Sequence, residues 1–354
     1  MALQVVIMAG GKGERLWPIS SADTPKQFIP FDGKQSLLRA TFERSLELTK
    51  PENIYVVTSV NLASKVSEEL PEIFKANILA EPVGRNTAPC IGYAAVVISR
   101  KDPEAVMAVF PADHLISEPV KLRNAIFFGH TALQAHPDLL ITLGILPDRP
   151  ETGYGYIAPE EDLLSQSKEG LTIKRVKSFH EKPARTLAEQ YLKRGYLWNA
   201  GMFIWRVDTI LEMFSRHMGD FFEELMKLKA TINKDPDSID RFYRAAPTVS
   251  IDYGIMEKAE HVAVIPVDFG WSDIGSWDAM DTLFPKDASS NAVRGSVEAI
   301  DSERNIIWST DKPIVLIGVQ DLVIVEGPDA ILVCPRNRAQ NVSTVVKKLE
   351  KWNK

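Results

Sequence analysis

Residues 5–26 read VVIMAGGKGERLWPISSADTPK, and this stretch decides how the rest of the chain is interpreted. A run of β-forming residues passes into three closely spaced glycines, Gly10, Gly11 and Gly13, which is the pattern of a strand followed by a tight turn. Glycine has no Cβ, so it adopts positive φ angles and lets consecutive backbone N–H groups point at one anion. We therefore expect a strand and a phosphate-binding loop that includes Ala9, with an ordinary tight turn as the alternative.

Two cationic residues, Arg15 and Lys26, follow the glycines within the same stretch. Arginine offers phosphate a planar fork and lysine a mobile point charge, so the combination favours a polyphosphate over a neutral ligand. The turn is neither a Walker loop nor an intact dinucleotide fingerprint, because Leu16 stands where the third glycine of the latter belongs. Taken singly, both cations also fit solvated surface positions.

The pattern GGKGERLWP, followed by PKQF, resembles the signature of the sugar-nucleotide pyrophosphorylases, and in particular of the mannose-1-phosphate guanylyltransferases. The resemblance runs through residues 4–284. It implies GTP and α-D-mannose 1-phosphate as substrates, GDP-mannose and diphosphate as products, and Mg²⁺ as cofactor. It also implies catalytic roles for Arg15, Lys26 and Lys182.

The composition excludes several classes of protein. With 354 residues, 45% of them hydrophobic, the chain is long enough for one large or two moderate domains. Its net charge of -6 disfavours binding to nucleic acid, and no apolar run is long enough to span a membrane. Cys90 and Cys334 form no disulfide framework and no metal-ligand spacing, and no secretory signal is visible, so we expect a cytoplasmic protein.

The order of predicted elements indicates an α/β fold. Strands near residues 5–8, 54–58, 76–80 and 105–110 alternate with amphipathic helices, which is typical of a Rossmann-like, mainly parallel sheet. A hairpin is expected between about 153 and 179. We assign residues 1–284 to a nucleotidyltransferase domain and 285–354 to a small β-rich domain that ends in a helix over 343–352. The resemblance suggests that the small domain is a left-handed β-helix.

Ligands of such sheets gather at the carboxyl ends of the strands, which directs attention to the loop EPVGRNTAPC, residues 81–90. We interpret it as the guanine site, because Glu81 can accept from the N1–H and N2–H₂ edge while Arg85 or backbone N–H groups donate to O6. Asn86 and Thr87 complete this nucleotide-binding set. The alternative is a proline-bearing turn with Asn86 or Thr87 as the N-cap of the next helix.

Two aspartates are candidate Mg²⁺ ligands. Asp113 stands in PADH at the end of a predicted strand, and Asp273 stands in GWSDIG, where the resembled family carries its second metal aspartate. Carboxylate oxygens are the ligands that Mg²⁺ prefers. Each aspartate fits equally well as the N-cap of a following helix. For Asp273 that helix begins near Ser276.

The sugar phosphate is expected to meet Gly153, Glu181 and Asn199. Glu181 and Lys182 lie in SFHEKP, which resembles the family's sugar-binding motif, and we expect the carboxylate to face hydroxyls and the lysine a phosphate. Asn199, in WNAG, donates and accepts at once, as vicinal hydroxyls require. A surface ion pair and a plain turn asparagine are the alternatives. Asp252 is a further contact with the sugar.

These expectations imply that the sugar phosphate attacks the α-phosphorus directly, so no nucleophilic triad is needed and catalysis consists of positioning and charge neutralisation. Alternatives are another base or hexose within the same class, a noncatalytic regulatory homologue, and, as the poorest fit, a nicotinamide oxidoreductase. A homodimer is expected.

Overall fold

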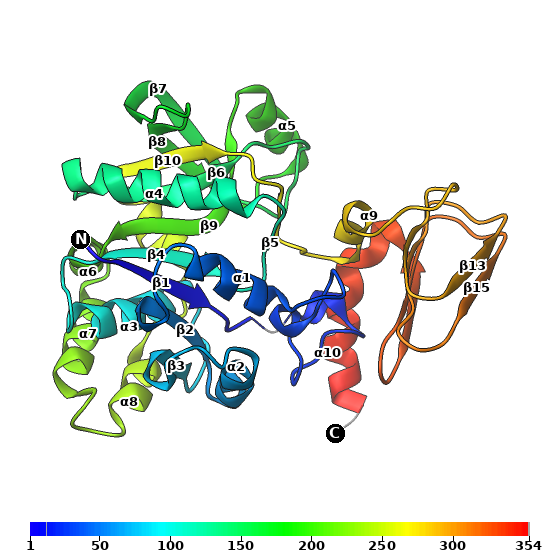
Figure 1. The fold of residues 1–354 in the computed structure, drawn as a ribbon, viewed down its shortest axis with the longest axis horizontal. Coiled ribbons are helices and arrows are strands. Elements are labelled where there is room, and N and C mark those ends of the chain that lie inside the picture. The colour runs from blue at the N-terminus through cyan, green and yellow to red at the C-terminus, as the bar shows by residue number, and fades with distance from the viewer. Residues whose placement is uncertain (12, 353–354) are drawn as a thin grey trace. The chain divides into compact units, whose positions relative to one another are not determined.

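The computed structural model describes residues 1–11 and 13–352 (Figure 1). The chain forms two compact units, each assembled from separate segments. The first comprises Met1–Gly10, Thr41–Ala112 and Ile116–Trp271, and the second Gly11–Ala40, Asp113–Leu115 and Ser272–Lys354. The expected domain boundary between residues 284 and 285 remains a prediction.

The described strands of the first unit form one mixed sheet in the order β3-β2-β1-β4-β9-β6-β10-β8-β7. Their bounds are β1 Leu3–Met8, β2 Ile54–Ser59, β3 Ile78–Glu81, β4 Val106–Pro111, β6 Leu140–Ile145, β7 Tyr156–Gln166, β8 Thr172–His180, β9 Leu197–Arg206 and β10 Val262–Val267. Pairs β3-β2, β2-β1, β1-β4 and β6-β10 are parallel. The expected α/β fold with a mixed, mainly parallel sheet flanked by helices is confirmed.

Strand β1 explains why the opening stretch organises this unit. Val5, Val6 and Ile7 are fully buried, since β1 has β2 on one side and β4 on the other and helices cover its faces. Strands buried on both faces read as continuous apolar runs rather than as alternating ones. The short run therefore ends, as expected, where the glycines begin.

Strand β9 was not assigned from the sequence. It lies antiparallel between β4 and β6, and its side chains alternate between the two faces of the sheet. Phe203 and Trp205 enter the core shared with the helices α3 (Thr87–Ser99), α6 (Val207–His217), α7 (Gly219–Thr231) and α8 (Ser238–Ala245). Ile204 faces Gly129 of α4 (Pro119–Ala135). Figure 1 shows α4 lying along the other face of the sheet. The expected hairpin is confirmed as β7 and β8, which pair antiparallel.

The helices follow their sequence patterns closely. Their bounds are α1 Leu37–Leu46, α2 Ala63–Glu69, α3 Thr87–Ser99, α4 Pro119–Ala135, α5 Arg185–Lys193, α6 Val207–His217, α7 Gly219–Thr231, α8 Ser238–Ala245, α9 Met280–Leu283 and α10 Val342–Trp352. A π-helical turn occupies Asp252–Met256. Among the described residues, none of these helices is both long and apolar enough to cross a bilayer.

The second unit contains the C-terminal strands. They are β12 Ala292–Arg294, β13 Val297–Ile300, β14 Ile306–Trp308, β15 Ile314–Ile317, β16 Leu322–Glu326 and β17 Ile331–Pro335, and two short strands, β5 Leu115–Ile116 and β11 Trp271–Ser272, span the unit boundaries. One sheet runs β12-β14-β16-β17 and a second pairs β13 with β15. The two sheets enclose a small core of Ile307, Leu316 and Ile324. The expected β-rich C-terminal region is confirmed, and the handedness of its coil remains a prediction.

A ladder of buried asparagines joins successive turns of the coil that the C-terminal strands β12 to β17 form. Asn305 is fully buried, and its Nδ2 donates to Asn291 Oδ1 at 2.9 Å and to the Val319 carbonyl at 3.1 Å. Its Oδ1 accepts from the Leu322 N–H at 2.9 Å. Arg304, directly before it, has φ of 54°. The ladder thus supplies partners for backbone groups that the sharp corners would otherwise leave unpaired.

Residues 13–31 belong to the second unit because their apolar side chains pack there. Leu16, Ile29 and Phe31 share a core with Trp277 and Trp308. The Trp277 indole donates to the Trp17 carbonyl at 2.9 Å, and Phe31 meets Trp308 edge to face with ring centroids 5.7 Å apart. These contacts hold the segment that carries Arg15 and Lys26.

Candidate active site

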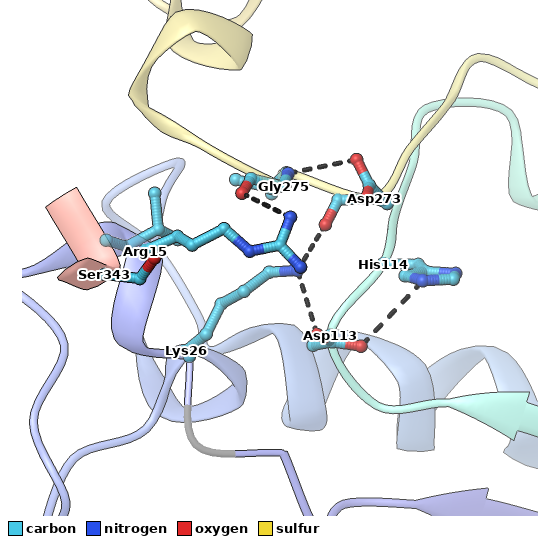
Figure 2. A pocket seen from close by; sticks show the side chains of 10 residues that line it. Arg15, Lys26, Asp113, His114, Asp273, Gly275 and Ser343 are labelled. Carbon is cyan, nitrogen blue, oxygen red and sulfur yellow. Dashed lines mark hydrogen bonds and ion pairs between the residues drawn. The ribbon is translucent and has the colours of Figure 1, made fainter. Parts of the chain in front are cut away.

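A pocket of about 400 Å³ lies within the second unit (Figure 2). Its walls come from segments that are far apart in the sequence: Gly13, Arg15, Leu16, Lys26, Asp113, His114, Asp273, Ile274, Gly275 and Ser343. The volume falls within the range of small-molecule sites. The pocket thus brings together Gly13, both cations of the opening stretch and both predicted metal aspartates.

Lys26 is the central side chain of the pocket. Its ammonium donates to Asp113 Oδ2 at 2.9 Å and to the backbone carbonyl of Asp273 (Figure 2). Lys26 is only 7% exposed, so the solvated surface alternative is wrong for this residue, whereas Arg15 is exposed. Pro25 starts the 3₁₀ turn Lys26–Phe28, whose fixed backbone aims the lysine inward.

Asp113 follows β4 in the chain and keeps 35% of its side chain exposed. Burial acts to raise the pKa of Asp113, but the Lys26 ammonium and His114 outweigh it, so this pKa lies below its ordinary value. The helix-cap alternative is wrong, because Glu118 is the N-cap residue of α4. Asp113 is therefore an ionised carboxylate at the pocket surface.

Asp273 presents its main chain and its side chain in different directions. Its carbonyl accepts from Lys26, while its Oδ1 accepts from the Gly275 N–H at 3.0 Å. Ile274, between them, has φ of 44°. The alternative that Asp273 caps the helix near Ser276 is also wrong, since Ser276 itself is the N-cap residue of the 3₁₀ turn Trp277–Ala279. The aspartate instead shapes a tight turn at the pocket wall.

The glycine turn approaches this cluster through Gly13, whose φ is 65°. A Cβ placed on Gly13 would lie 2.7 Å from the Lys26 Cβ and 2.8 Å from its backbone nitrogen, so only glycine permits this contact. Arg15 Nη1 points to the Gly275 carbonyl at 3.4 Å. Gly11 has open space around it, and Lys12, between the glycines, lies outside the described residues.

The donor atoms of the pocket fit a small divalent cation. Asp113 and Asp273 offer only oxygen, and the Lys26 ammonium already stands as a cation between the carboxylate of one and the carbonyl of the other. In the described part of the chain, no cluster of three or more His, Cys, Asp or Glu side chains is able to hold a metal. Mg²⁺ is typically held by one or two carboxylates with phosphates and water completing its shell, so this sparse set suits it.

The predicted guanine site belongs to the first unit. Glu81, at the end of β3, is 5% exposed, and its Oε1 accepts from the Tyr243 hydroxyl at 2.9 Å. A Cβ on Gly10 would stand 3.1 Å from Glu81 Oε2, so this glycine and the carboxylate are neighbours. Burial raises the pKa of Glu81 to about 7, and the Tyr243 hydrogen bond opposes that rise. Ala9 is buried in the same unit, with its N–H on the Val57 carbonyl at 2.8 Å.

The other three residues predicted to bind the nucleotide, Arg85, Asn86 and Thr87, form hydrogen bonds within the protein. Arg85 donates from Nε to the Tyr243 carbonyl at 3.1 Å and from Nη1 to Thr248 Oγ1 at 3.3 Å. Asn86 is the N-cap of α3 and accepts from the Thr87 N–H at 2.8 Å, which confirms the capping alternative for it. Thr87 Oγ1 accepts from the Ile251 N–H at 2.8 Å. The loop is thereby fastened to the segment after α8, and its nucleotide-binding role remains a prediction.

The predicted sugar residues also lie in the first unit. Asn199 donates to Asp252 Oδ1 at 2.7 Å, and a Cβ on Gly155 would come within 2.5 Å of Glu181 Oε2 and 3.5 Å of the Asn199 Cβ. Asn199 is part of β9, so the plain turn alternative is wrong for it. Burial raises the pKa of Asp252; the Asn199 hydrogen bond opposes this and the Glu181 carboxylate adds to it. The structure therefore brings Glu181, Asn199 and Asp252 together around Gly155.

Lys182 and Gly153 are placed less centrally. The Lys182 ammonium lies 2.5 Å from Glu181 Oε1, and the Lys182 side chain is 63% exposed. The backbone of Lys182 has a φ of 45°. The contact between Lys182 and Glu181 is therefore the surface ion pair of the alternative interpretation. The Gly153 N–H donates to Glu151 Oε1 at 3.0 Å rather than to the Glu181 group.

Sequence reasoning missed two residues of these sites. Ser343 lines the pocket from the first turn of α10, and Tyr243 holds both Glu81 and Arg85 from α8. Neither residue belongs to a recognisable motif, because each acts through its position on an amphipathic helix. A buried tyrosine needs a partner for its hydroxyl, and that need is the one signal the sequence offered for Tyr243.

Two family models account for nearly the whole chain. The model described as nucleotidyl transferase matches residues 4–290. The model described as MannoseP isomerase/GMP-like beta-helix domain matches residues 295–349. The second match agrees with the β-rich coil of the C-terminal region.

Individual relatives are similar over almost all of the chain. Mannose-1-phosphate guanylyltransferase of Escherichia coli (strain K12) is 35% identical over 98% of this chain and 73% of its own length. The enzyme of the same name from Klebsiella pneumoniae is 38% identical over 98% of this chain and 73% of its own. A crystal structure named mannose-1-phosphate geranyltransferase, from Thermus thermophilus, is 35% identical and matches with a TM-score of 0.88 over 99% of this chain and 100% of that one. The chain therefore belongs to the nucleotidyl transferase family and, within it, to the mannose-1-phosphate guanylyltransferases.

Proposed function

We propose that the protein converts GTP and α-D-mannose 1-phosphate into GDP-mannose and diphosphate, with Mg²⁺ as its divalent ion. The observation that carries the proposal is the Lys26 ammonium, which is buried and directed at Asp113 and Asp273 in a pocket that Arg15 also lines. A cation and two aspartates at one wall, with an arginine beside them, suit the binding of phosphates together with a metal.

The reaction is an in-line displacement between two anions. A phosphate oxygen of mannose 1-phosphate forms a bond to the α-phosphorus of GTP as the bond from that phosphorus to the bridging oxygen of diphosphate breaks. The attacking phosphate is already ionised at neutral pH, so no proton has to be removed by the protein. Catalysis then requires that two anions be held in line and their charge neutralised.

We assign these tasks to the pocket residues of the second unit. Arg15 and the backbone of Gly11 and Gly13 bind the triphosphate, and Lys26 neutralises charge where the two phosphates meet. Asp113 and Asp273 would hold the divalent ion, which would supply charge neutralisation at the α-phosphate. Removing one such preorganised group typically costs about 3 kcal/mol of transition-state stabilisation, or roughly 10² in rate.

Recognition of the two substrates is assigned to the first unit. Glu81 accepts from the N1–H and N2–H₂ groups of guanine, and Gly10 lets the nucleotide approach. Arg85, Asn86 and Thr87 keep that loop in place. Glu181 and Asn199, with Asp252 beside them, bind the sugar hydroxyls, and Lys182 turns to the sugar phosphate.

The remaining features of the proposal concern the setting of the enzyme. We infer a cytoplasmic homodimer that binds neither nucleic acid nor membrane, in keeping with the net charge of -6 and the two cysteines of the chain. Light scattering of the purified protein checks the dimer, and a monomer at micromolar concentration contradicts it.

The deciding experiment measures diphosphate release. Each of GTP, ATP, UTP and dTTP is combined with mannose 1-phosphate, glucose 1-phosphate and other hexose 1-phosphates, with and without Mg²⁺. We expect the largest kcat/KM for GTP with mannose 1-phosphate and none above background without a divalent ion. A different preferred pair corrects the base or the sugar, and no release with any pair would leave a regulatory homologue as the interpretation.

A further inference from the structure

Lys26 already pairs with one of the two carboxylates that a divalent cation would need. Its ammonium lies 2.9 Å from Asp113 Oδ2 and also contacts the Asp273 carbonyl, so both aspartates of the predicted metal site share this one ion (Figure 2). The other oxygen of Asp113 faces His114 Nε2 at 3.9 Å. Asp273 Oδ1 accepts from the Gly275 N–H. Asp113 Oδ2, the oxygen that pairs with Lys26, is thus the one directed into the group of Lys26, Asp113 and Asp273.

A metal ion and this ammonium repel each other if both sit on Asp113. The Lys26 side chain is only 8% exposed, so water screens the repulsion poorly. One carboxylate carries one negative charge, which the ammonium neutralises already. A divalent ion that arrives alone must therefore displace the ammonium or share the carboxylate with it at a cost.

The Lys26 side chain is fixed at its base and flexible toward its end. Gly13 packs against the Lys26 backbone and Cβ, which fixes where the side chain starts. Beyond that point the side chain is a flexible stem with a point charge, and other acceptors satisfy it equally well. A phosphate bound beside Arg15 in the same pocket would offer such acceptors.

We propose that Lys26 is a built-in competitor of the metal: its ammonium holds Asp113 in the substrate-free protein, so a divalent ion that arrives alone binds weakly, and the ion binds Asp113 tightly when Lys26 transfers to an incoming polyphosphate. In this exchange the phosphates take over the charge of the ammonium as the divalent ion takes its place on Asp113. It follows that the ion and the nucleotide bind with strong positive coupling, and that the free ion binds weakly. The inference rests on the proposed function in taking Asp113 as a ligand of the divalent ion and that polyphosphate as GTP.

The direct test titrates the substrate-free protein with Mn²⁺ alone and follows the free ion by electron paramagnetic resonance. Lys26→Met removes the charge and keeps most of the side-chain volume. We expect the variant to bind Mn²⁺ about tenfold or more tightly than the unaltered protein, since one like charge at contact distance is removed. Asp113→Asn in the Lys26→Met background should abolish the gain. Circular dichroism establishes that each variant is folded.

A matched control comes from the surface. Lys121 and Glu118 form a lysine–carboxylate pair with the same separation of 2.9 Å, but both side chains are about half exposed. Lys121→Met removes one positive charge and releases one carboxylate, as Lys26→Met does. Its affinity for Mn²⁺ should equal that of the unaltered protein. An equal gain in both variants would attribute the effect to net charge and overturn the exchange.

A second measurement needs no substitution and so remains decisive if Lys26→Met does not fold. The rate at which an amine reagent labels Lys26 is followed by mass spectrometry, with the rate at Lys121 as internal reference. Saturating Mg²⁺ alone should accelerate labelling of Lys26, because the ion releases the amine from Asp113. GTP with Mg²⁺ should suppress it, because the phosphates take the amine. Labelling that Mg²⁺ leaves unchanged, or Mn²⁺ binding that Lys26→Met weakens, overturns the proposal.

These outcomes are separable from failure of the proposed function. The titration and the Mg²⁺ arm of the labelling contain no nucleotide or sugar, so they stand even if the diphosphate assay identifies other substrates. Conversely, synthesis of GDP-mannose with no gain in Mn²⁺ affinity leaves the function intact and removes the exchange alone.

Discussion

The hydroxyl of Tyr243 donates to the buried carboxylate of Glu81 at 2.9 Å, and the carbonyl of the same tyrosine accepts from Arg85. One residue of α8 therefore fixes both the carboxylate that we assign to the guanine base and the arginine that keeps its loop in place. The hydrogen bond also bears on ionisation, because it opposes the effect of burial, which brings the pKa of Glu81 to about 7. Glu81 is thus ionised above neutral pH and protonated below it.

Tyr243→Phe should impair recognition of the base at neutral pH. Loss of the hydrogen bond that lowers the pKa of Glu81 raises that pKa above about 7, so a larger share of the carboxyl is protonated and accepts poorly from guanine. We expect KM for GTP to rise roughly tenfold at pH 7 with a smaller change in kcat, since hydrogen bonds to charged groups contribute about 1.5–3 kcal/mol. Steady-state kinetics with GTP and ITP measure both the loss and the reduced preference for the 2-amino group.

The pH profile separates this effect from the ionisation of the phosphates. In the unaltered protein, binding of GTP should strengthen as the pH rises through about 7, and in Tyr243→Phe the midpoint should move upward. Glu81→Gln should lose this step while it keeps the steps that belong to the phosphates. An unshifted midpoint in Tyr243→Phe would show that the hydroxyl does not act through Glu81.

Gly155→Ala should weaken binding of the sugar phosphate selectively. The added methyl would lie 2.5 Å from Glu181 Oε2, and the carboxylate, as the end of a flexible side chain, must swing away. We expect KM for mannose 1-phosphate to rise at least about tenfold while KM for GTP changes little, because one charged hydrogen-bond acceptor is displaced. Gly219→Ala, where the added methyl meets nothing within 4 Å, is the matched control. A selective rise in KM for GTP contradicts the assignment of Glu181.

Lys26→Ala should reduce turnover far more than stability. The ammonium is assigned to the reacting phosphates, so we expect kcat to fall by roughly 10². Its partner Asp113 keeps 35% exposure and is hydrated once the lysine is gone, which limits the loss of stability. Single-turnover kinetics and thermal melts of the same preparation make the comparison. Retained turnover together with a lower melting temperature would assign Lys26 to structure instead.

Asn305→Ala should destabilise the C-terminal coil. The substitution leaves the half-buried Leu322 N–H without its acceptor, and it takes one donor from the Val319 carbonyl, which keeps the Glu303 N–H as the other. The orphaned N–H costs about 1–3 kcal/mol, so we expect a loss of roughly 2 kcal/mol in the free energy of unfolding. Urea denaturation checks this, with the exposed Asn61 changed to Ala as control. An unchanged midpoint would mean that the ladder adds nothing beyond the backbone pairing.

The sequence supported some of these features and concealed others for physical reasons. Local periodicity located β1, the helices and the hairpin, because it depends on neighbours along the chain. It did not reveal that β9 divides β4 from β6, since strand order is a matter of distant contacts. The repeat of the C-terminal coil was missed because Asn305 pairs with Asn291, 14 residues earlier, and with Leu322, 17 residues later, so these contacts follow no fixed period.

The same contrast holds for the sites. The glycines, Lys26, Asp113 and Asp273 were chosen because their types suit phosphates and metal, and the fold brings most of them to one pocket. The burial of Lys26 was not predictable, because it depends on the packing of Leu16, Phe31 and Trp277 in one core. Tyr243 was not predictable because its role depends on which residues it contacts.

The way in which the pocket draws on Gly13, Asp113, Asp273 and Ser343 has a consequence for biosynthesis. A ribosome delivers these residues in that order, so a nascent chain that has reached Trp271 holds every described strand of the large sheet and still lacks the second aspartate. On the proposed assignment, catalysis therefore depends on residues that are synthesised only after the last strand of the large sheet.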